Sequence, residues 1–204
     1  MKFSANLGFL WADLPLPEAI HAAKKAGFDA VECHWPYDVD AQEVKGALDE
    51  TGLPMLGLNT FRGNPGENGL TALPGREDEA RAAIDQALTY ALTTGTQAVH
   101  IMSGFATGAE AYATFVKNLR YAATEAAKVD KTLLIEPLNP YDAPGYFLNS
   151  TELATQIIDE VAAPNLKLMF DCYHVQLIQG DLTHRLTKLL PYMGSVADRG
   201  GILR

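Results

Sequence analysis

Cysteine, basic residues and long hydrophobic runs are all scarce in this sequence of 204 residues. Its two cysteines, Cys33 and Cys172, are too few and too far apart for a disulfide framework, which favours a reducing compartment. Sixteen Lys and Arg against 25 Asp and Glu give a net charge of −9, which argues against a surface that coats nucleic acid. No stretch approaches the roughly 18 apolar residues of a membrane span, and the first residues lack the pattern of a signal peptide. We therefore expect a cytoplasmic protein without a nucleic-acid or membrane partner.

Glycine-rich nucleotide-binding motifs are missing as well. The segment NLGFL at residues 6–10 follows the first expected strand but lacks the G-x-G-x-x-G spacing, and no Walker A sequence occurs. These absences argue against the nucleotide-binding forms of an open α/β sheet and favour a closed barrel. The composition is otherwise ordinary, with 48% apolar and 20% charged residues, so the chain can bury a sizeable core.

Short apolar runs alternate with longer amphipathic stretches along the chain. The apolar runs predict six strands, at residues 3–7, 30–34, 55–59, 98–102, 133–136 and 166–170. The amphipathic stretches predict helices at residues 16–26, 41–51, 76–94, 110–129 and 151–161, with a less regular stretch at 175–190. Strict alternation of strand and helix predicts an α/β domain with a parallel sheet. A loop at residues 60–73, rich in Gly, Asn and Pro, has the length of a lid or binding loop.

Two carboxylates end neighbouring expected strands. Glu136 follows the apolar run LLI, and Asp171 follows LMF in the same way. Ligands bind at the carboxyl ends of parallel strands in both barrels and open sheets, so the two side chains would face one spot. A carboxylate beside a dry strand is costly unless a cation or hydrogen bonds hold it, and Mg²⁺ or Mn²⁺ prefers such oxygen ligands. His174, three residues after Asp171, would contact the metal or the substrate.

Four more polar residues are candidates for substrate binding. Asn59, His34 and His100 lie at or near expected strand ends. For the two histidines a purely structural role stays open. Arg62, which lies in the long loop, has the guanidinium group that binds a substrate carboxylate in a bidentate contact, although a surface role stays open for it too.

Several segments then suggest a family. FSANL, GFDAVECHWPYD, LPGRE, NLRYAA, LLIEPLN and FDCYHVQ occur in this order and together resemble the hydroxypyruvate isomerase family, a member of the xylose-isomerase-like group of TIM barrels. The resemblance covers nearly the whole chain. It implies an α/β fold, a TIM (β/α)₈-type barrel with about six βα units present in this chain. It also implies an isomerase, of the intramolecular oxidoreductase type, that interconverts an aldehyde and a ketone in a small hydroxy-oxo acid, with hydroxypyruvate and tartronate semialdehyde as the family's named pair.

The resemblance also implies roles for three residues. By position, Glu136 matches the family's metal-binding and proton-shuttling glutamate, Asp171 its metal-binding aspartate, and His174 a substrate-contacting histidine. A divalent cation, Mg²⁺ or Mn²⁺, would polarise the carbonyl and hydroxyl oxygens of the substrate. Glu136 would remove a proton from the carbon next to the carbonyl, and the enediolate would be reprotonated on the neighbouring carbon.

The end of the chain departs from the family pattern. The family continues with a seventh strand that carries a Gln or His metal ligand and an eighth strand that carries a second catalytic glutamate. Residues 190–194 look like the approach to strand seven, and residues 195–204 show no ligand-bearing seventh strand and no eighth strand. We therefore expect residues 1–204 to form a single, C-terminally shortened barrel domain that holds its cation weakly.

Two other functions stay open. One is a sugar or oxo-sugar-acid epimerase or isomerase of the same superfamily. The other is a catalytically inactive barrel with a binding or assembly role, which would favour a homo-oligomer because unpaired edge strands invite association. The DNA-repair nucleases of the superfamily fit poorly, because they use clusters of metal ligands and this acidic chain has five histidines.

Overall fold

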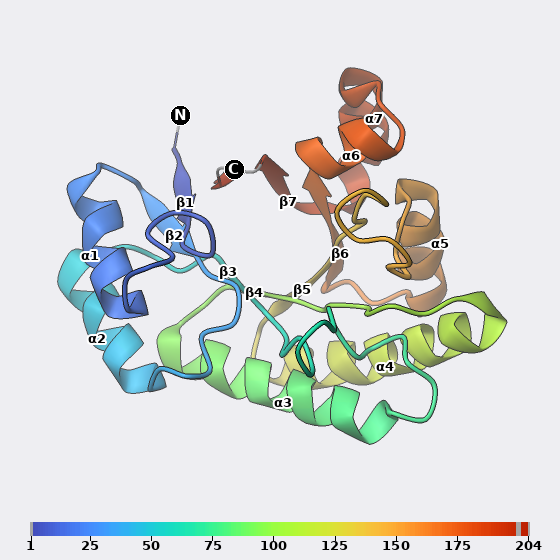
Figure 1. Ribbon diagram of the computed structural model, residues 1–204, viewed down its shortest axis with the longest axis horizontal. Coiled ribbons are helices and arrows are strands. Elements are labelled where there is room, and N and C mark those ends of the chain that lie inside the picture. Colours follow the sequence, from blue (N-terminus) through green and yellow to red (C-terminus); the bar gives the residue numbers. More distant parts are fainter. Residues whose placement is uncertain (1, 199–200, 204) are drawn as a thin grey trace.

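The computed structural model describes residues 2–198 and 201–203, in which parallel strands curve around a centre and helices cover the outside (Figure 1). The strands are β1 (Ser4–Asn6), β2 (Ala30–Glu32), β3 (Gly57–Asn59), β4 (Ala98–His100), β5 (Thr132–Ile135), β6 (Leu166–Asp171), β7 (Met193–Asp198) and β8 (Gly201–Leu203). β1 pairs with β2, and β3 to β7 pair in sequence, all parallel. A single parallel bridge from Val31 to Met55 joins the two sheets, and β8 contacts β1, so the strands nearly surround the centre.

The helices lie where the amphipathic stretches predict them. They are α1 (Leu16–Lys25), α2 (Ala41–Thr51), α3 (Glu77–Thr94), α4 (Gly108–Lys128), α5 (Thr151–Val161), α6 (Cys172–Ile178) and α7 (Leu182–Leu189), followed by the 3₁₀ turn η1 (Leu190–Tyr192). The irregular stretch at 175–190 becomes two short helices, α6 and α7. α3 and α4 run along the outside of the strands, with α1 and α2 at one side and α5 to α7 at the other (Figure 1). No helix of the described residues is long and apolar enough to cross a membrane.

Alternation along the strands divides the apolar side chains between two faces. Leu133 and Ile135 of β5 are fully buried in the large core between the strands and the helices. Leu134, the residue between them, instead packs with Ala98 and Met169 in a separate small cluster. Strands covered on both faces therefore read as continuous apolar runs, as the sequence indicates for β5 and β6.

The C-terminal part differs from the expectation. β7 pairs parallel with β6 and is a seventh strand in addition to the six predicted ones, directly after the approach expected at residues 190–194. β8 is a further strand that was not expected, although it runs antiparallel to β7 and so is not a parallel barrel strand. The segment MGSVAD mixes apolar and polar residues, so its sequence does not predict a strand. It becomes one because it pairs with β6. The side chains from Val196 onward lie outside the described part of the structure. The prediction that the seventh strand carries no metal ligand therefore concerns residues outside that part as well.

The loop at residues 60–73 is pinned against the segment that follows β4. Gly69 forms an antiparallel bridge with Ser103, and the amide of Ala72 donates to the Ser103 carbonyl over 2.7 Å. The contact requires glycine at two points. A Cβ on Gly69 (φ +114°) would overlap the Met102 carbonyl, and a Cβ on Gly104 (φ +93°) would overlap the carbonyl of Gly69. The loop is therefore anchored where its backbone contacts residues 102–104 so closely that only glycine fits at positions 69 and 104.

Gly104→Ala is expected to lower the free energy of unfolding by roughly 2–5 kcal/mol. The left-handed backbone conformation costs a non-glycine residue about 1–2 kcal/mol, and the overlap with Gly69 costs about 1–3 kcal/mol more. Urea unfolding monitored by circular dichroism measures the change. Gly66→Ala is the control, because Gly66 has a similar φ of +90° but open space around its Cβ position. An equal loss of unfolding free energy in both variants would show that the contact between Gly104 and Gly69 tolerates a methyl group.

Candidate active site

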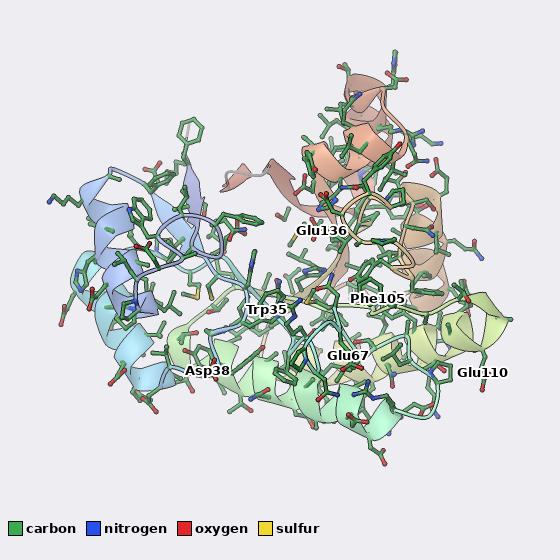
Figure 2. All side chains as sticks on the ribbon, in the orientation of Figure 1. Trp35, Asp38, Glu67, Phe105, Glu110 and Glu136 are labelled. Atoms are coloured by element: carbon green, nitrogen blue, oxygen red, sulfur yellow. The ribbon has the colours of Figure 1, made fainter. Side chains whose placement is uncertain are left out.

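The carboxyl ends of six strands converge on one cavity. Each strand presents a polar residue there, either its last residue or the next one along the chain. These residues are Asn6 (β1), Glu32 (β2), Asn59 (β3), His100 (β4), Glu136 (after β5) and Asp171 (β6). Phe9, His34, Asp142 and His174 also line the cavity. Figure 2 shows Glu136 in the central part of the molecule, whereas Glu110 lies at its outer edge. The cavity is at the position expected for a barrel active site.

Three of these residues could hold a metal ion. Glu136, Asp171 and His174 each offer one ligand atom, and the three atoms lie within 4.8 Å of one another. Glu136 and Asp171 are buried, at 9% and 8% exposure. The structure thus brings together the two carboxylates and the histidine that the sequence analysis selected.

The backbone orients Asp171 and His174. Oδ1 of Asp171 accepts hydrogen bonds from the amides of Tyr173 (2.7 Å) and His174 (3.2 Å), which makes Asp171 the N-cap of α6. Nδ1 of His174 lies 3.1 Å from the amide nitrogen of Asn139. A backbone amide only donates, so Nδ1 accepts, and in the neutral ring the proton is on Nε2. This tautomer suits His174 as a hydrogen-bond donor to a substrate oxygen, with Glu136 and Asp171 left as the oxygen ligands.

The electrostatics of the cavity fit a divalent cation. Burial, and then the nearby charges of Asp171 and Glu32, raise the pKa of Glu136 well above its usual value. Burial and the Asp171 charge raise the pKa of Glu32 to about 8, although a hydrogen bond from Asn6 acts in the opposite direction. In the described part of the chain, no Lys or Arg side chain lines this cavity to offset these carboxylates. A hard divalent ion would supply the missing positive charge and favours carboxylate oxygens.

His100 contacts Asn59 inside the cavity wall. Burial, with smaller effects of His34 and His174, lowers the pKa of His100 to about 3, so its ring is neutral at physiological pH. Its Nδ1 lies 3.2 Å from Oδ1 of Asn59 and 3.8 Å from Oε2 of Glu136. Nδ1 is therefore the protonated nitrogen, which donates to the Asn59 oxygen. The described residues offer no partner to Nε2 of His100, which is fully buried.

His34 and Arg62 lie on one side of the cavity, but only His34 lines it. The His34 ring packs edge-on against Phe9, with centroids 4.9 Å apart, and burial followed by the Arg62 charge lowers its pKa to about 4. The Arg62 guanidinium stacks 4.4 Å above the Trp35 ring and donates from Nε to the Glu67 carbonyl. Arg62 thus stands behind His34 rather than in the cavity wall, and its charge reaches the cavity through its effect on His34.

Sequence reasoning did not select Glu32 and Asn6 as site residues. Both are the last residues of their strands, which is the same signal that selected Asn59 and Asp171. Glu32 is followed directly by Cys33 and His34, and the sequence analysis selected His34 rather than Glu32 as the candidate from that strand. Cys33 is buried and free, in line with the expectation that the two cysteines form no disulfide framework.

A family model described as "Xylose isomerase-like TIM barrel" matches residues 20–197. The chain belongs to this family. A 2-oxo-tetronate isomerase of Cupriavidus necator is 40% identical over 98% of this chain and 79% of its own length. The hydroxypyruvate isomerase of Escherichia coli is 37% identical over 95% of this chain and 78% of its own length. The chain is therefore a member of the hydroxypyruvate isomerase and 2-oxo-tetronate isomerase group, as its motifs suggested.

Solved structures agree with the fold. A crystal structure of an AP endonuclease, family 2, from Brucella melitensis superposes with a TM-score of 0.93 at 36% identity, covering 97% of this chain and 79% of that chain. The 3-keto-D-glucoside 4-epimerase YcjR of E. coli gives a TM-score of 0.80 at 21% identity, covering 97% of this chain and 78% of that one. The second match shows the shared barrel fold alone. The family model and the Brucella structure confirm the predicted α/β xylose-isomerase-like barrel.

Proposed function

We propose that this chain isomerises a small hydroxy-oxo acid by moving the carbonyl between adjacent carbons. Hydroxypyruvate, which would give tartronate semialdehyde, is the three-carbon form of this substrate, and a 2-oxo-tetronate is the four-carbon form. The activities of relatives at 37% and 40% identity, a hydroxypyruvate isomerase and a 2-oxo-tetronate isomerase, support both forms. The observation that carries the proposal is the buried pair of carboxylates, Glu136 and Asp171, beside His174 at the strand ends.

Glu136 transfers the proton. Its carboxylate removes a proton from the hydroxyl-bearing carbon next to the carbonyl, which leaves an enediolate, and the protonated group returns a proton to the former carbonyl carbon. The hydroxyl proton moves to the other oxygen, so atoms and charge balance. The pKa of Glu136, raised by burial and by neighbouring carboxylates, suits a group that must accept and then release a proton.

Glu136 and Asp171 would hold a divalent ion of the Mg²⁺ or Mn²⁺ type. When bound, this ion polarises the carbonyl and stabilises negative charge on the two substrate oxygens. His174 donates from Nε2 to a substrate oxygen, in the tautomer that Asn139 favours. His34 and Asn59 form part of the wall around the substrate, and neutral His100 holds the Asn59 amide in place.

The assay uses the purified chain with hydroxypyruvate or 2-oxo-tetronate in D₂O, with MgCl₂ or MnCl₂, followed by ¹H NMR. We expect conversion of at least one substrate and incorporation of deuterium from the solvent at the reacting carbon, because the enediolate is reprotonated there. A chelator should stop both. Absence of conversion and of deuterium exchange with both substrates would overturn the proposal and favour the inactive barrel.

Arg62→Met is expected to raise KM about 10-fold and to change kcat less than about 3-fold. Arg62 is the cation that reaches the cavity wall closely enough to lower the pKa of His34, so it attracts the substrate carboxylate in the ground state and the transition state alike. Arg81→Met is the matched control, since the Arg81 guanidinium also stacks on an aromatic ring, but that ring belongs to Tyr121 of α4, a helix on the outside of the strands (Figure 1). A large fall in kcat with unchanged KM would contradict a binding role.

A further inference from the structure

Glu32 and Asn6 form a polar pair on the cavity wall. They are register partners at the ends of β2 and β1. Oδ1 of Asn6 accepts from the amide of Gly8 over 2.9 Å, so the amide nitrogen of Asn6 is the group that hydrogen-bonds the Glu32 carboxyl. Both side chains line the cavity, and Glu32 is only 6% exposed. The pair is thus a built, oriented donor and acceptor inside the cavity.

The pair lies across the cavity from the proposed metal ligands. β1 and β2 stand on one side of the molecule, whereas β6 and the helices after it stand on the other (Figure 1). Glu32 does not belong to the cluster of ligand atoms from Glu136, Asp171 and His174. Glu32 nevertheless lines the same cavity as the cluster, so a small molecule held at that cluster would reach it.

The chemistry of the pair matches a hydroxyl group. A carboxyl oxygen accepts a hydroxyl proton, and an amide N–H donates to a hydroxyl oxygen, so the pair can satisfy both functions of one alcohol. A substrate carboxylate fits the pair less well, because it only accepts hydrogen bonds and would be repelled by Glu32 whenever that group ionises. In a three-carbon hydroxy-oxo acid, the two oxygens on the reacting carbons face the metal ligands and the third carbon is the carboxylate, which leaves no hydroxyl for this pair.

We propose that Glu32 and Asn6 bind a hydroxyl on the substrate carbon beyond the two reacting carbons, so that the chain prefers four-carbon hydroxy-oxo acids to three-carbon ones. This inference rests on the proposed isomerase function. It assigns Glu32 a substrate contact rather than a metal ligand role. A polar group buried at such a site discriminates strongly against a substrate that leaves it unpaired.

The experiment compares wild type, Glu32→Gln and Glu32→Leu with 2-oxo-tetronate and hydroxypyruvate. We expect wild type to have the higher kcat/KM for the four-carbon acid. Glu32→Leu should lower that value roughly 10- to 100-fold, as expected when a buried hydrogen-bonding group is left without its partner, and lower the value for hydroxypyruvate less than about 3-fold. Glu32→Gln, which keeps an accepting oxygen, should have a kcat/KM for the four-carbon acid between those of wild type and Glu32→Leu. Thermal melts verify that both variants are folded.

Binding of non-reacting acids gives a second readout. Isothermal titration in the presence of Mn²⁺ should show erythronate, a four-carbon hydroxy acid, binding more tightly than glycerate to wild type but not to Glu32→Leu. Mn²⁺ affinity itself should fall less than about 10-fold, because Glu32 adds charge to the cavity but no ligand atom to the cluster. Equal losses for both substrates, or a Mn²⁺ affinity at least 10-fold weaker in Glu32→Leu, would overturn the inference while leaving the isomerase function intact. A wild-type chain that converts neither acid would overturn the proposed function instead.

Discussion

Glu136→Gln is expected to lower kcat for the isomerisation by about 10²–10⁴-fold, the usual contribution of a positioned general acid–base group. Glutamine keeps the shape and the hydrogen-bonding oxygen of glutamate but cannot take up and return a proton. The substitution also removes a buried carboxyl whose pKa is raised by burial and by the charges of Asp171 and Glu32. The variant should therefore fold at least as well as wild type in the absence of metal.

Steady-state turnover, solvent deuterium exchange and thermal melts together test this prediction. Loss of exchange in parallel with turnover locates the defect at proton transfer rather than at product release. Glu110→Gln is the control, because Glu110 is exposed at the outer edge of the molecule (Figure 2). A Glu136→Gln protein that retains more than about a tenth of wild-type kcat would show that another group transfers the proton.

The fold was largely predictable because each strand–helix unit carries its own local signal. α2 and α5 have the predicted bounds, since Asp40 and Ser150 provide side-chain N-caps and a left-handed residue ends each helix. Most of the strands are shorter than their apolar runs, because pairing rather than hydrophobicity ends a strand. β7 was missed because its sequence lacks an apolar run and its position depends on pairing with β6.

The site was predictable in part for the same reason. Glu136 and Asp171 follow long apolar runs, so their charges are conspicuous in the sequence. Glu32 follows a two-residue run, and its importance comes from Asn6, which is 26 residues away but is its partner across β1 and β2. Such a pair becomes visible only when the strand register is known. The neutral state of His100 likewise follows from burial in the folded protein, which no local pattern encodes.

Asp171→Asn is expected to weaken Mn²⁺ binding roughly 100-fold or more and to lower activity at limiting metal in proportion. Loss of a residue that only hydrogen-bonds a metal ligand already costs roughly 10–100-fold in metal affinity, and removal of a charged ligand should cost at least as much. Asparagine retains the oxygen that accepts from the amides of Tyr173 and His174, and Asn and Asp cap helices about equally well. The loss should therefore come from the metal site rather than from α6.

Thermal melts with and without Mn²⁺ separate these two effects. A ligand that binds only the folded state stabilises it by RT ln(1 + [L]/Kd), so saturating Mn²⁺ should raise the Tm of wild type and barely change that of Asp171→Asn. Without metal, the variant should melt at or above wild type, because Asp171 is a like charge that raises the pKa of both Glu32 and Glu136. Asp40→Asn is the matched control: Asp40 caps α2 through the amide of Gln42 and lies outside the cavity, so its response to Mn²⁺ should equal that of wild type. If Asp171→Asn melted lower without metal and responded to Mn²⁺ like wild type, Asp171 would be a helix cap and not a ligand.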